Sequence, residues 1–153
     1  MGLYGNIFSG ESKKKKVFLG GTCNESTWRN ELIGKLFIDY FNPVVDDWTE
    51  ECYQRELQER ANSDFVLYVI TPRMTGVYSI AEVIDDSNKQ PEKTFFVFLR
   101  EDNGFTFNEG QIKSLDKVGE MVKRNGGTYI SGENVDMGVV AEVLNKKGGY
   151  NGW

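Results

Sequence analysis

The feature that most constrains the fold of this chain is an alternation of short apolar runs with segments of helical periodicity. Uninterrupted apolar runs are typical of parallel strands whose two faces are both covered. The runs predict strands at residues 17–19, 37–41, 65–70, 95–99 and 128–130. Between them, apolar residues recur at helical spacing near residues 28–36, 53–61, 79–88, 112–122 and 137–144. We therefore predict an α/β fold: a doubly wound, flavodoxin- or Rossmann-like sheet of five parallel strands with helices on both faces.

The length of 153 residues suits one such domain. We place a flexible leader at residues 1–15, the α/β domain at 16–147 and an aromatic tail at 148–153. No apolar run approaches the roughly 20 residues that cross a bilayer, and the N-terminus lacks the pattern of a secretory signal. Cys23 and Cys52 form no metal or redox motif, so we expect reduced thiols in a cytoplasmic protein.

Charge and residue usage narrow the possible chemistry. The formal net charge of −5 disfavours a nucleic-acid polymer as partner. The chain has no histidine, which excludes Ser-His-Asp and Cys-His catalysis and the usual zinc sites. We expect no metal and no cofactor. Any acid–base or covalent catalysis would then have to use carboxylates, Tyr, Lys, Cys or backbone groups.

In doubly wound sheets, ligands bind at the carboxyl ends of the strands, so the loops that follow the predicted strands are the candidate binding regions. Gly20, Gly21 and Thr22 follow the first predicted strand. Two glycines let the backbone approach a ligand closely, and a tight turn from strand to helix would use them equally well. Neither the dinucleotide-binding glycine pattern nor the P-loop lysine pattern is present.

The loop after the second strand carries Asp46, Asp47 and Trp48. The indole could stack on a nucleobase beside two carboxylates in the predicted crevice. The alternative is a helix start in which one of the aspartates is the N-cap and Trp48 packs inward.

Residues 71–82 link the central strand to the next helix. Glu82 lies off the apolar stripe of that helix, in its first turn, where a carboxylate nucleophile would face the crevice. The alternative is a capping box in which Glu82 reaches back to the Ser79 amide. Arg73 would suit a 5′-phosphate or be a solvated loop residue. Glu56, on the preceding helix, could simply form a surface ion pair with Arg60.

Several motifs, taken in their order along the chain, resemble the nucleoside 2-deoxyribosyltransferase superfamily, and in particular its divergent deoxyribosyltransferase-like branch. They lie at residues 17–22, 28–29, 41–48, 63–64 and 78–82 within a resemblance that covers residues 16–145. The resemblance implies the doubly wound fold and an enzyme that cleaves the N-glycosidic bond of 2′-deoxynucleosides by base exchange or hydrolysis.

The resemblance also implies roles for individual residues. Glu82 matches the nucleophile of the family, and Tyr78 belongs to the same substrate-binding motif. Glu56 has the spacing of an acidic residue, usually Asp, that assists the leaving base. Asn108 matches an Asn that contacts the sugar in a neighbouring subunit, which implies a homo-oligomer. The C-terminal aromatic residue that the family uses would be Tyr150 or Trp153.

The sequence differs from the better-known members of the family in one respect, and this leaves alternative functions open. The better-known transferases have a further Asp shortly before the nucleophile, and residues 65–81 contain none. A deoxynucleotide N-glycosidase, an NAD-cleaving enzyme of the TIR type and a non-catalytic nucleotide-binding module therefore remain as alternatives. All take a nucleoside or nucleotide as the partner, and none needs a membrane.

Overall fold

The computed structural model describes residues 13–151. Most of the predicted leader and the candidate aromatic Trp153 lie outside this range. In chain order the elements are β1 (Lys16–Gly21), α2 (Trp28–Ile33), β2 (Asp39–Phe41), α3 (Glu50–Asn62), β3 (Phe65–Ile70), α4 (Tyr78–Lys89), η1 (Pro91–Lys93), β4 (Thr94–Phe98), β5 (Glu101–Asp102), β6 (Phe105–Thr106), α5 (Glu109–Arg124), β7 (Thr128–Tyr129) and α6 (Met137–Lys147).

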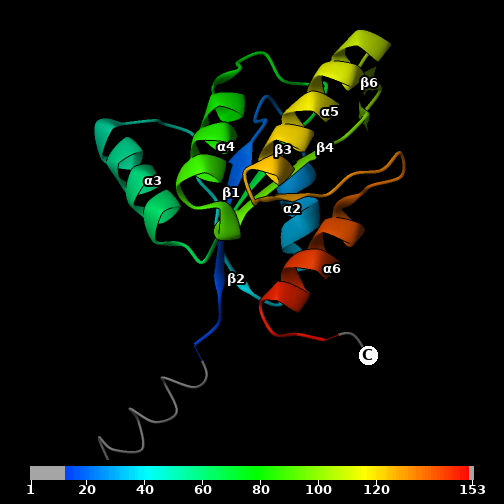
Figure 1. The fold of residues 1–153 in the computed structure, drawn as a ribbon. Coiled ribbons are helices and arrows are strands. Elements are labelled where there is room, and N and C mark those ends of the chain that lie inside the picture. The colour runs from blue at the N-terminus through cyan, green and yellow to red at the C-terminus, as the bar shows by residue number, and fades with distance from the viewer. Residues whose placement is uncertain (1–12, 152–153) are drawn as a thin grey trace, which may run out of the picture.

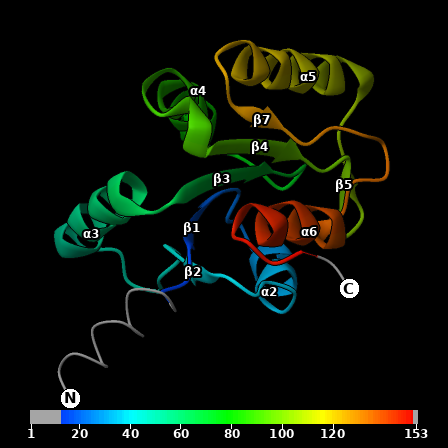
Figure 2. The same cartoon turned by 60° about the horizontal axis from the view of Figure 1, so that its bottom comes forward.

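The main sheet has five parallel strands in the order β2-β1-β3-β4-β7 (Figure 1; β7 is labelled in Figure 2). The predicted doubly wound, flavodoxin-like sheet is therefore confirmed. The chain reverses its direction of travel across the sheet between β1 and β3, so the carboxyl ends of these two strands form the switch point. Ligands of open α/β sheets bind at this point.

Alternate residues of the strands supply two separate cores, because side chains of a strand point to opposite faces. Leu19, Leu67 and Phe95 pack under α2 and α6, and Phe18, Tyr68 and Phe96 pack under α4 and α5. Figure 2 shows these two helix pairs on opposite sides of the sheet. The continuous apolar runs in the sequence arise because both faces are covered.

Helix α3 is held differently from the other long helices. None of its side chains is buried, and Figure 2 shows it at the side of the sheet rather than over its centre. Polar contacts attach it: Lys16 Nζ lies 2.7 Å from Glu59 Oε1, and Arg60 reaches the carboxylates of α4. This sparse packing leaves room for a cavity between α3 and α4.

Two local predictions need correction. The second strand begins at Asp39 rather than residue 37, because the Phe37 amide donates to Asn145 Oδ1 of α6 instead of joining the sheet. The segment between the predicted strand at residues 95–99 and the following helical segment contains the hairpin β5–β6, which the apolar pattern did not predict. Asn103 and Gly104 both have positive φ, 49° and 88°, as a tight two-residue hairpin turn requires.

Within residues 13–151, none of the helices has the length and apolar character that a bilayer crossing requires. Cys23 and Cys52 are both free thiols. The predicted cytoplasmic location and homo-oligomer stay predictions.

Candidate active site

A cavity of about 230 Å³ lies between α3 and α4. It brings together four residues singled out from the sequence, namely the two glutamates and two aromatic residues, and adds three others. Its lining residues are Trp48, Tyr53, Glu56, Leu57, Arg60, Tyr78 and Glu82. Two carboxylates, one guanidinium and three aromatic rings in so small a space are an arrangement suited to binding and reacting with a ring-shaped polar molecule.

Glu82 faces this cavity and does not cap its own helix. Helix α4 begins at Tyr78, and its N-cap, Val77, makes no side-chain capping bond. Ser79 is thus already the second helical residue, and Glu82 lies beyond the N3 position that a capping box needs. The capping-box alternative is wrong, and Glu82 Oε2 instead lies 3.6 Å from Arg60 Nη1.

The environment of Glu82 disfavours its charged form. Its side chain is 16% exposed. Burial raises the pKa of Glu82 to about 7, nearby Arg60 lowers it, and the carboxylates of Glu56 and Asp86 add to the rise. Glu82 therefore exchanges its proton near neutral pH, as a group in acid–base or nucleophilic chemistry should.

Glu56 is the second carboxylate of the cavity. Burial raises its pKa, and Trp48, Arg29 and Arg60 oppose the rise. The alternative of a surface ion pair between Glu56 and Arg60 is not seen within the described part of the chain, where Arg60 forms its ion pairs with α4. Glu56 is thus a second carboxyl group in the cavity, and it stays protonated to a higher pH than an ordinary glutamate does.

Arg60 is the functional candidate that sequence reasoning missed. Its guanidinium holds Asp86 with two hydrogen bonds, Nε to Oδ2 at 2.9 Å and Nη2 to Oδ1 at 3.0 Å. Asp86 is buried and also accepts a hydrogen bond from the Tyr68 hydroxyl. Asp85 lies 3.2 Å from Arg60 Nη2. The spacing of Glu82, Asp85 and Asp86 on one helical face was the signal for a cation on a neighbouring helix.

Trp48 lies at the cavity with its side chain largely in solvent. It is 60% exposed, and its ring centroid lies 5.6 Å from that of Tyr53. Helix α3 is capped by Thr49, whose hydroxyl accepts from the Cys52 amide at 3.2 Å. The alternative of an aspartate N-cap with Trp48 packed inward is therefore wrong. Asp46 and Asp47 are exposed and do not line the cavity.

The two glycines at the end of β1 lie in close contact with residues of β3, so the space beside them is filled by the protein itself rather than left for a ligand. A Cβ on Gly20 would lie 2.7 Å from the Tyr68 ring, and one on Gly21 would overlap the carbonyl oxygen of Val69. Gly21 also has φ = +120°. Thr22 is buried and accepts a hydrogen bond from the Thr71 amide at 3.0 Å. The three residues pack β1 against β3 and lie outside the cavity lining.

Arg73 lies with the β5–β6 hairpin. Its Nε is 3.8 Å from Asp102 Oδ1, and its guanidinium stands 4.5 Å from the centroid of the Phe105 ring. Asp102 also accepts from the Ser26 hydroxyl, and Asn24 Nδ2 donates to the Arg73 carbonyl at 2.9 Å. These contacts join three loops at the carboxyl edge of the sheet.

The remaining candidates from the sequence also lie elsewhere. Asn108 caps α5 by accepting from the Gln111 amide at 2.8 Å, and the Gln111 side chain accepts from the Asn108 amide, so a capping box forms at the start of α5. Tyr150 packs on Phe37, with ring centroids 5.8 Å apart, against the core under α2 and α6. Neither side chain lines the cavity of Glu82.

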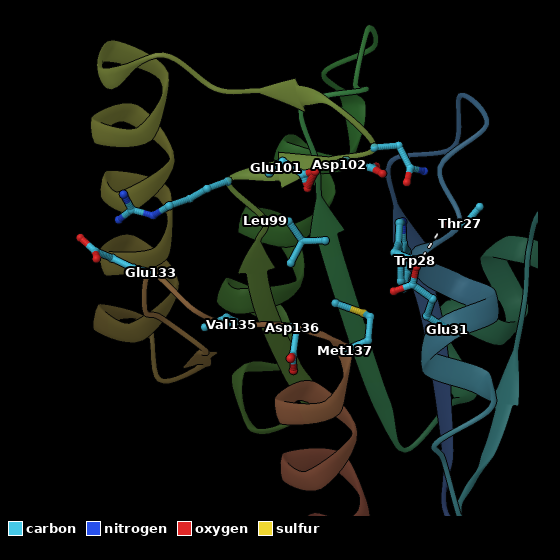
Figure 3. Close-up of a pocket in the computed structure, with 12 residues that line it drawn as sticks. Thr27, Trp28, Glu31, Leu99, Glu101, Asp102, Glu133, Val135, Asp136 and Met137 are labelled. Atoms are coloured by element: carbon cyan, nitrogen blue, oxygen red, sulfur yellow. Dashed lines mark hydrogen bonds between the residues drawn. The ribbon is translucent and has the colours of Figure 1, made fainter.

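A second hollow, of about 300 Å³, lies at the carboxyl end of β4. Figure 3 shows its lining side chains, which come from α2, the loop after β4 and the segment that enters α6. It is rich in carboxylates, among them Glu31, Asp102 and Asp136. In the described range, no group of three or more His, Cys, Asp or Glu residues is placed to hold a metal ion. No site residue predicted from the sequence lines this hollow.

Comparison with known protein families gives a match. A family model described as nucleoside 2-deoxyribosyltransferase like matches residues 14–94, more than half of the chain. The matched part runs from β1 to the start of β4 and includes every lining residue of the cavity between α3 and α4. No curated protein matches the chain.

Proposed function

Because the chain belongs to the nucleoside 2-deoxyribosyltransferase-like family, we propose that it cleaves the N-glycosidic bond of 2′-deoxynucleosides with Glu82 as nucleophile. The observation that carries the proposal is the meeting of Glu82 and Glu56 in one cavity beside Trp48 and Tyr78. Cleavage of a glycosidic bond passes through an oxocarbenium-like state, for which two carboxyl groups suffice.

In the first step, a carboxylate oxygen of Glu82 attacks C1′ of the deoxyribose. The bond from C1′ to the base nitrogen breaks, and its electron pair stays on the base. Glu56 donates its proton to the departing base, so the base leaves neutral and Glu56 becomes a carboxylate. The product is a deoxyribosyl ester of Glu82.

In the second step, an acceptor attacks C1′ of this ester and Glu82 departs as a carboxylate. The acceptor is water for hydrolysis or the nitrogen of another base for exchange. Glu56 takes the proton that the acceptor loses, which restores the starting state. Two displacements at C1′ retain the anomeric configuration.

This division of labour requires one proton on the two carboxyl groups, placed on Glu56. Because the pKa of Glu82 is raised to about 7 and that of Glu56 is raised less, the form with the proton on Glu56 is the minor tautomer of the singly protonated pair. Each carboxylate raises the proton affinity of its neighbour, as Glu56 does for Glu82, so the pair holds a single proton over a range of pH. A raised pKa also makes the ionised Glu82 carboxylate more basic and hence more nucleophilic.

The aromatic residues supply a place for the base. Trp48 and Tyr78 both line the cavity and are 60% and 64% exposed, so a bound base can reach their rings. Stacking of a base on an aromatic side chain contributes about 1–3 kcal/mol. We propose that these two rings hold the nucleobase while the sugar lies toward Glu82.

The test is release and exchange of bases. The protein is incubated with each common deoxynucleoside plus free adenine, and in parallel with deoxynucleoside monophosphates and with NAD. Glu82→Gln and the surface variant Glu142→Gln are run beside the wild type. Glu142 pairs with Lys146 on α6, far from the site in sequence, and serves as a matched removal of one carboxylate.

We expect wild type and Glu142→Gln to release base and Glu82→Gln to lose at least about 1,000-fold in rate, as removal of a nucleophile does. A slow 2-fluoro sugar should leave a glycosyl adduct on Glu82 that intact-mass and peptide analysis locate. Cleavage of NAD with inert deoxynucleosides would instead identify an NAD-cleaving enzyme. Nucleoside binding without turnover, unchanged in Glu82→Gln, would identify a binding module.

A further inference from the structure

Arg60 connects the two helices that carry the paired glutamates. It lies on α3 one turn after Glu56, and its guanidinium crosses to α4. There it meets three carboxylates, those of Glu82, Asp85 and Asp86. Since α3 has no buried side chain, this guanidinium is a main attachment of α3 to α4.

The guanidinium is itself fixed from the sheet side. Asp86 is 5% exposed as a side chain and receives two hydrogen bonds from Arg60 in a fork geometry. The Tyr68 hydroxyl donates to the same carboxylate from β3. Burial, followed by the Asp86 charge, raises the pKa of Tyr68, which keeps the hydroxyl protonated as a donor. A chain of three side chains thus runs from the sheet to the cavity.

We propose that Arg60, anchored by Asp86 and Tyr68, is a positioning residue that orients the Glu82 carboxylate for attack and keeps α3, with Glu56, at the cavity. The inference rests on the proposed function of Glu82. It assigns the Arg60 side chain two tasks that a surface ion pair could not perform. One is to favour the ionised form of Glu82, and the other is to fix the separation of the two carboxylates.

The charge balance of the site supports the first task. Without Arg60, Glu82 would face only acidic or neutral groups at the cavity. The titratable and charged groups that act on Glu82 from the elements around it are Glu56 and Arg60 of α3, Tyr68 of β3, and Asp86 of α4. Arg60 is the one cation among them and is placed to offset the desolvation of Glu82.

The experiment compares Arg60→Lys, Arg60→Gln and the double variant Arg60→Gln/Asp86→Asn. Lysine keeps the charge but cannot reproduce the fork, so it should recover part of the function. The double variant removes the cation without leaving Asp86 as an unpaired buried charge, which protects folding. Lys89→Ala is the matched control, because Lys89 pairs with Asp85 at 3.0 Å on the solvent side of α4.

Two measurements are made on variants that keep native circular dichroism. We expect the double variant to lose on the order of 100-fold in kcat with a smaller change in KM. The carboxyl carbon of Glu82, assigned in a glutamate-labelled sample by comparison with Glu82→Gln, should titrate about 1 pH unit higher in Arg60→Gln than in wild type. The double variant also lacks the Asp86 charge, which raises the pKa of Glu82, so its midpoint is compared with that of Asp86→Asn and should lie above it. Lys89→Ala should match wild type in both.

The outcomes separate this inference from the proposed function. If folded Arg60→Gln keeps the wild-type titration midpoint of Glu82, or the folded double variant keeps the midpoint of Asp86→Asn, Arg60 does not control that carboxylate and the inference fails whatever the activity. If the titration midpoint of Glu82 rises but the wild type cleaves no nucleoside, the proposed function fails. The effect of Arg60 on the ionisation of Glu82 is then still supported. A raised midpoint with an unchanged kcat would also overturn the positioning role.

Discussion

Arg73 Nε and Asp102 Oδ1 lie 3.8 Å apart, and this pair joins the loop before α4 to the β5–β6 hairpin. The Arg73 guanidinium also stands over the Phe105 ring. Both charged side chains are largely covered, at 19% and 7% exposure. From the sequence, Arg73 was a candidate for binding a 5′-phosphate, and the structure shows that its charge already has a partner.

We therefore expect Arg73→Ala to affect stability more than phosphate recognition. Loss of the pair leaves the Asp102 carboxylate covered and without its cation, which should lower the free energy of unfolding by about 1–3 kcal/mol. Thermal unfolding measures this loss, and the ratio of kcat/KM for a deoxynucleoside to that for its monophosphate measures selectivity. A selective collapse of monophosphate turnover in a stable Arg73→Ala variant would show that Arg73 binds phosphate.

Gly21 is expected to tolerate no side chain. Its φ of +120° disfavours L residues, and an added Cβ would overlap the backbone of Val69 in β3. Gly21→Ala should destabilise the protein by about 2–4 kcal/mol. Gly76→Ala is the control, because a Cβ there meets nothing within 4 Å. Chemical denaturation of the two variants tests this, and equal midpoints would contradict the expected packing of β1 on β3.

The fold was predictable because its signals are local and repeated. The run Phe65–Ile70 is a buried strand in the structure, as its six apolar residues indicate. The β5–β6 hairpin was missed, although Asn103-Gly104 is the dipeptide typical of such turns. The flanking strands have two residues each, too short to show an alternating pattern.

The site was predictable only in part, because its geometry depends on how α3 and α4 face each other. The family resemblance indicated Glu82 and Glu56 together, whereas the sequence pattern gave each a local alternative partner, Ser79 and Arg60. In the structure Arg60 instead pairs with residues more than 20 positions away, Asp86 among them. Distances across two helices do not follow from periodicity along either one, so the role of Arg60 could not be deduced from sequence.

Glu82→Gln should make the folded protein more stable at neutral and alkaline pH. The folded-state pKa of Glu82, about 7, lies above its ordinary value of 4.5, so the folded state binds more protons between these two values. The contribution of Glu82 to stability is therefore greatest below pH 4.5 and is lost as pH rises through 7. Glutamine does not ionise and avoids this loss, which should be worth about 1–3 kcal/mol at pH 8.

Urea unfolding at pH 4.5 and at pH 8 measures this effect. The difference in stability between Glu82→Gln and wild type should grow in favour of the variant as pH rises. Glu142→Gln, which changes an exposed carboxylate of α6, should show no such trend. A constant difference across pH would mean that Glu82 titrates in the folded protein as it does in the unfolded chain.

The rate of nucleoside cleavage should follow a bell-shaped pH profile whose alkaline limb lies near pH 7. Above that limb both carboxyl groups are ionised, since the pKa of Glu82 is about 7 and that of Glu56 is raised to a lesser degree from 4.5. No proton then remains for the leaving base, and kcat/KM falls. Below the acid limb both groups are protonated and no nucleophile remains. These two limbs belong to the coupled pair rather than to either residue.

Glu56→Gln distinguishes the two roles. This variant has no proton donor for the base, so its rate on ordinary deoxynucleosides should fall by about 100-fold. It also loses the like charge that raises the pKa of Glu82, so Glu82 ionises at lower pH. The alkaline limb should therefore disappear, and kcat/KM should rise to a plateau through a pKa below 7. If the alkaline limb persists in Glu56→Gln, another group protonates the base, and Glu56 acts only through its charge on Glu82.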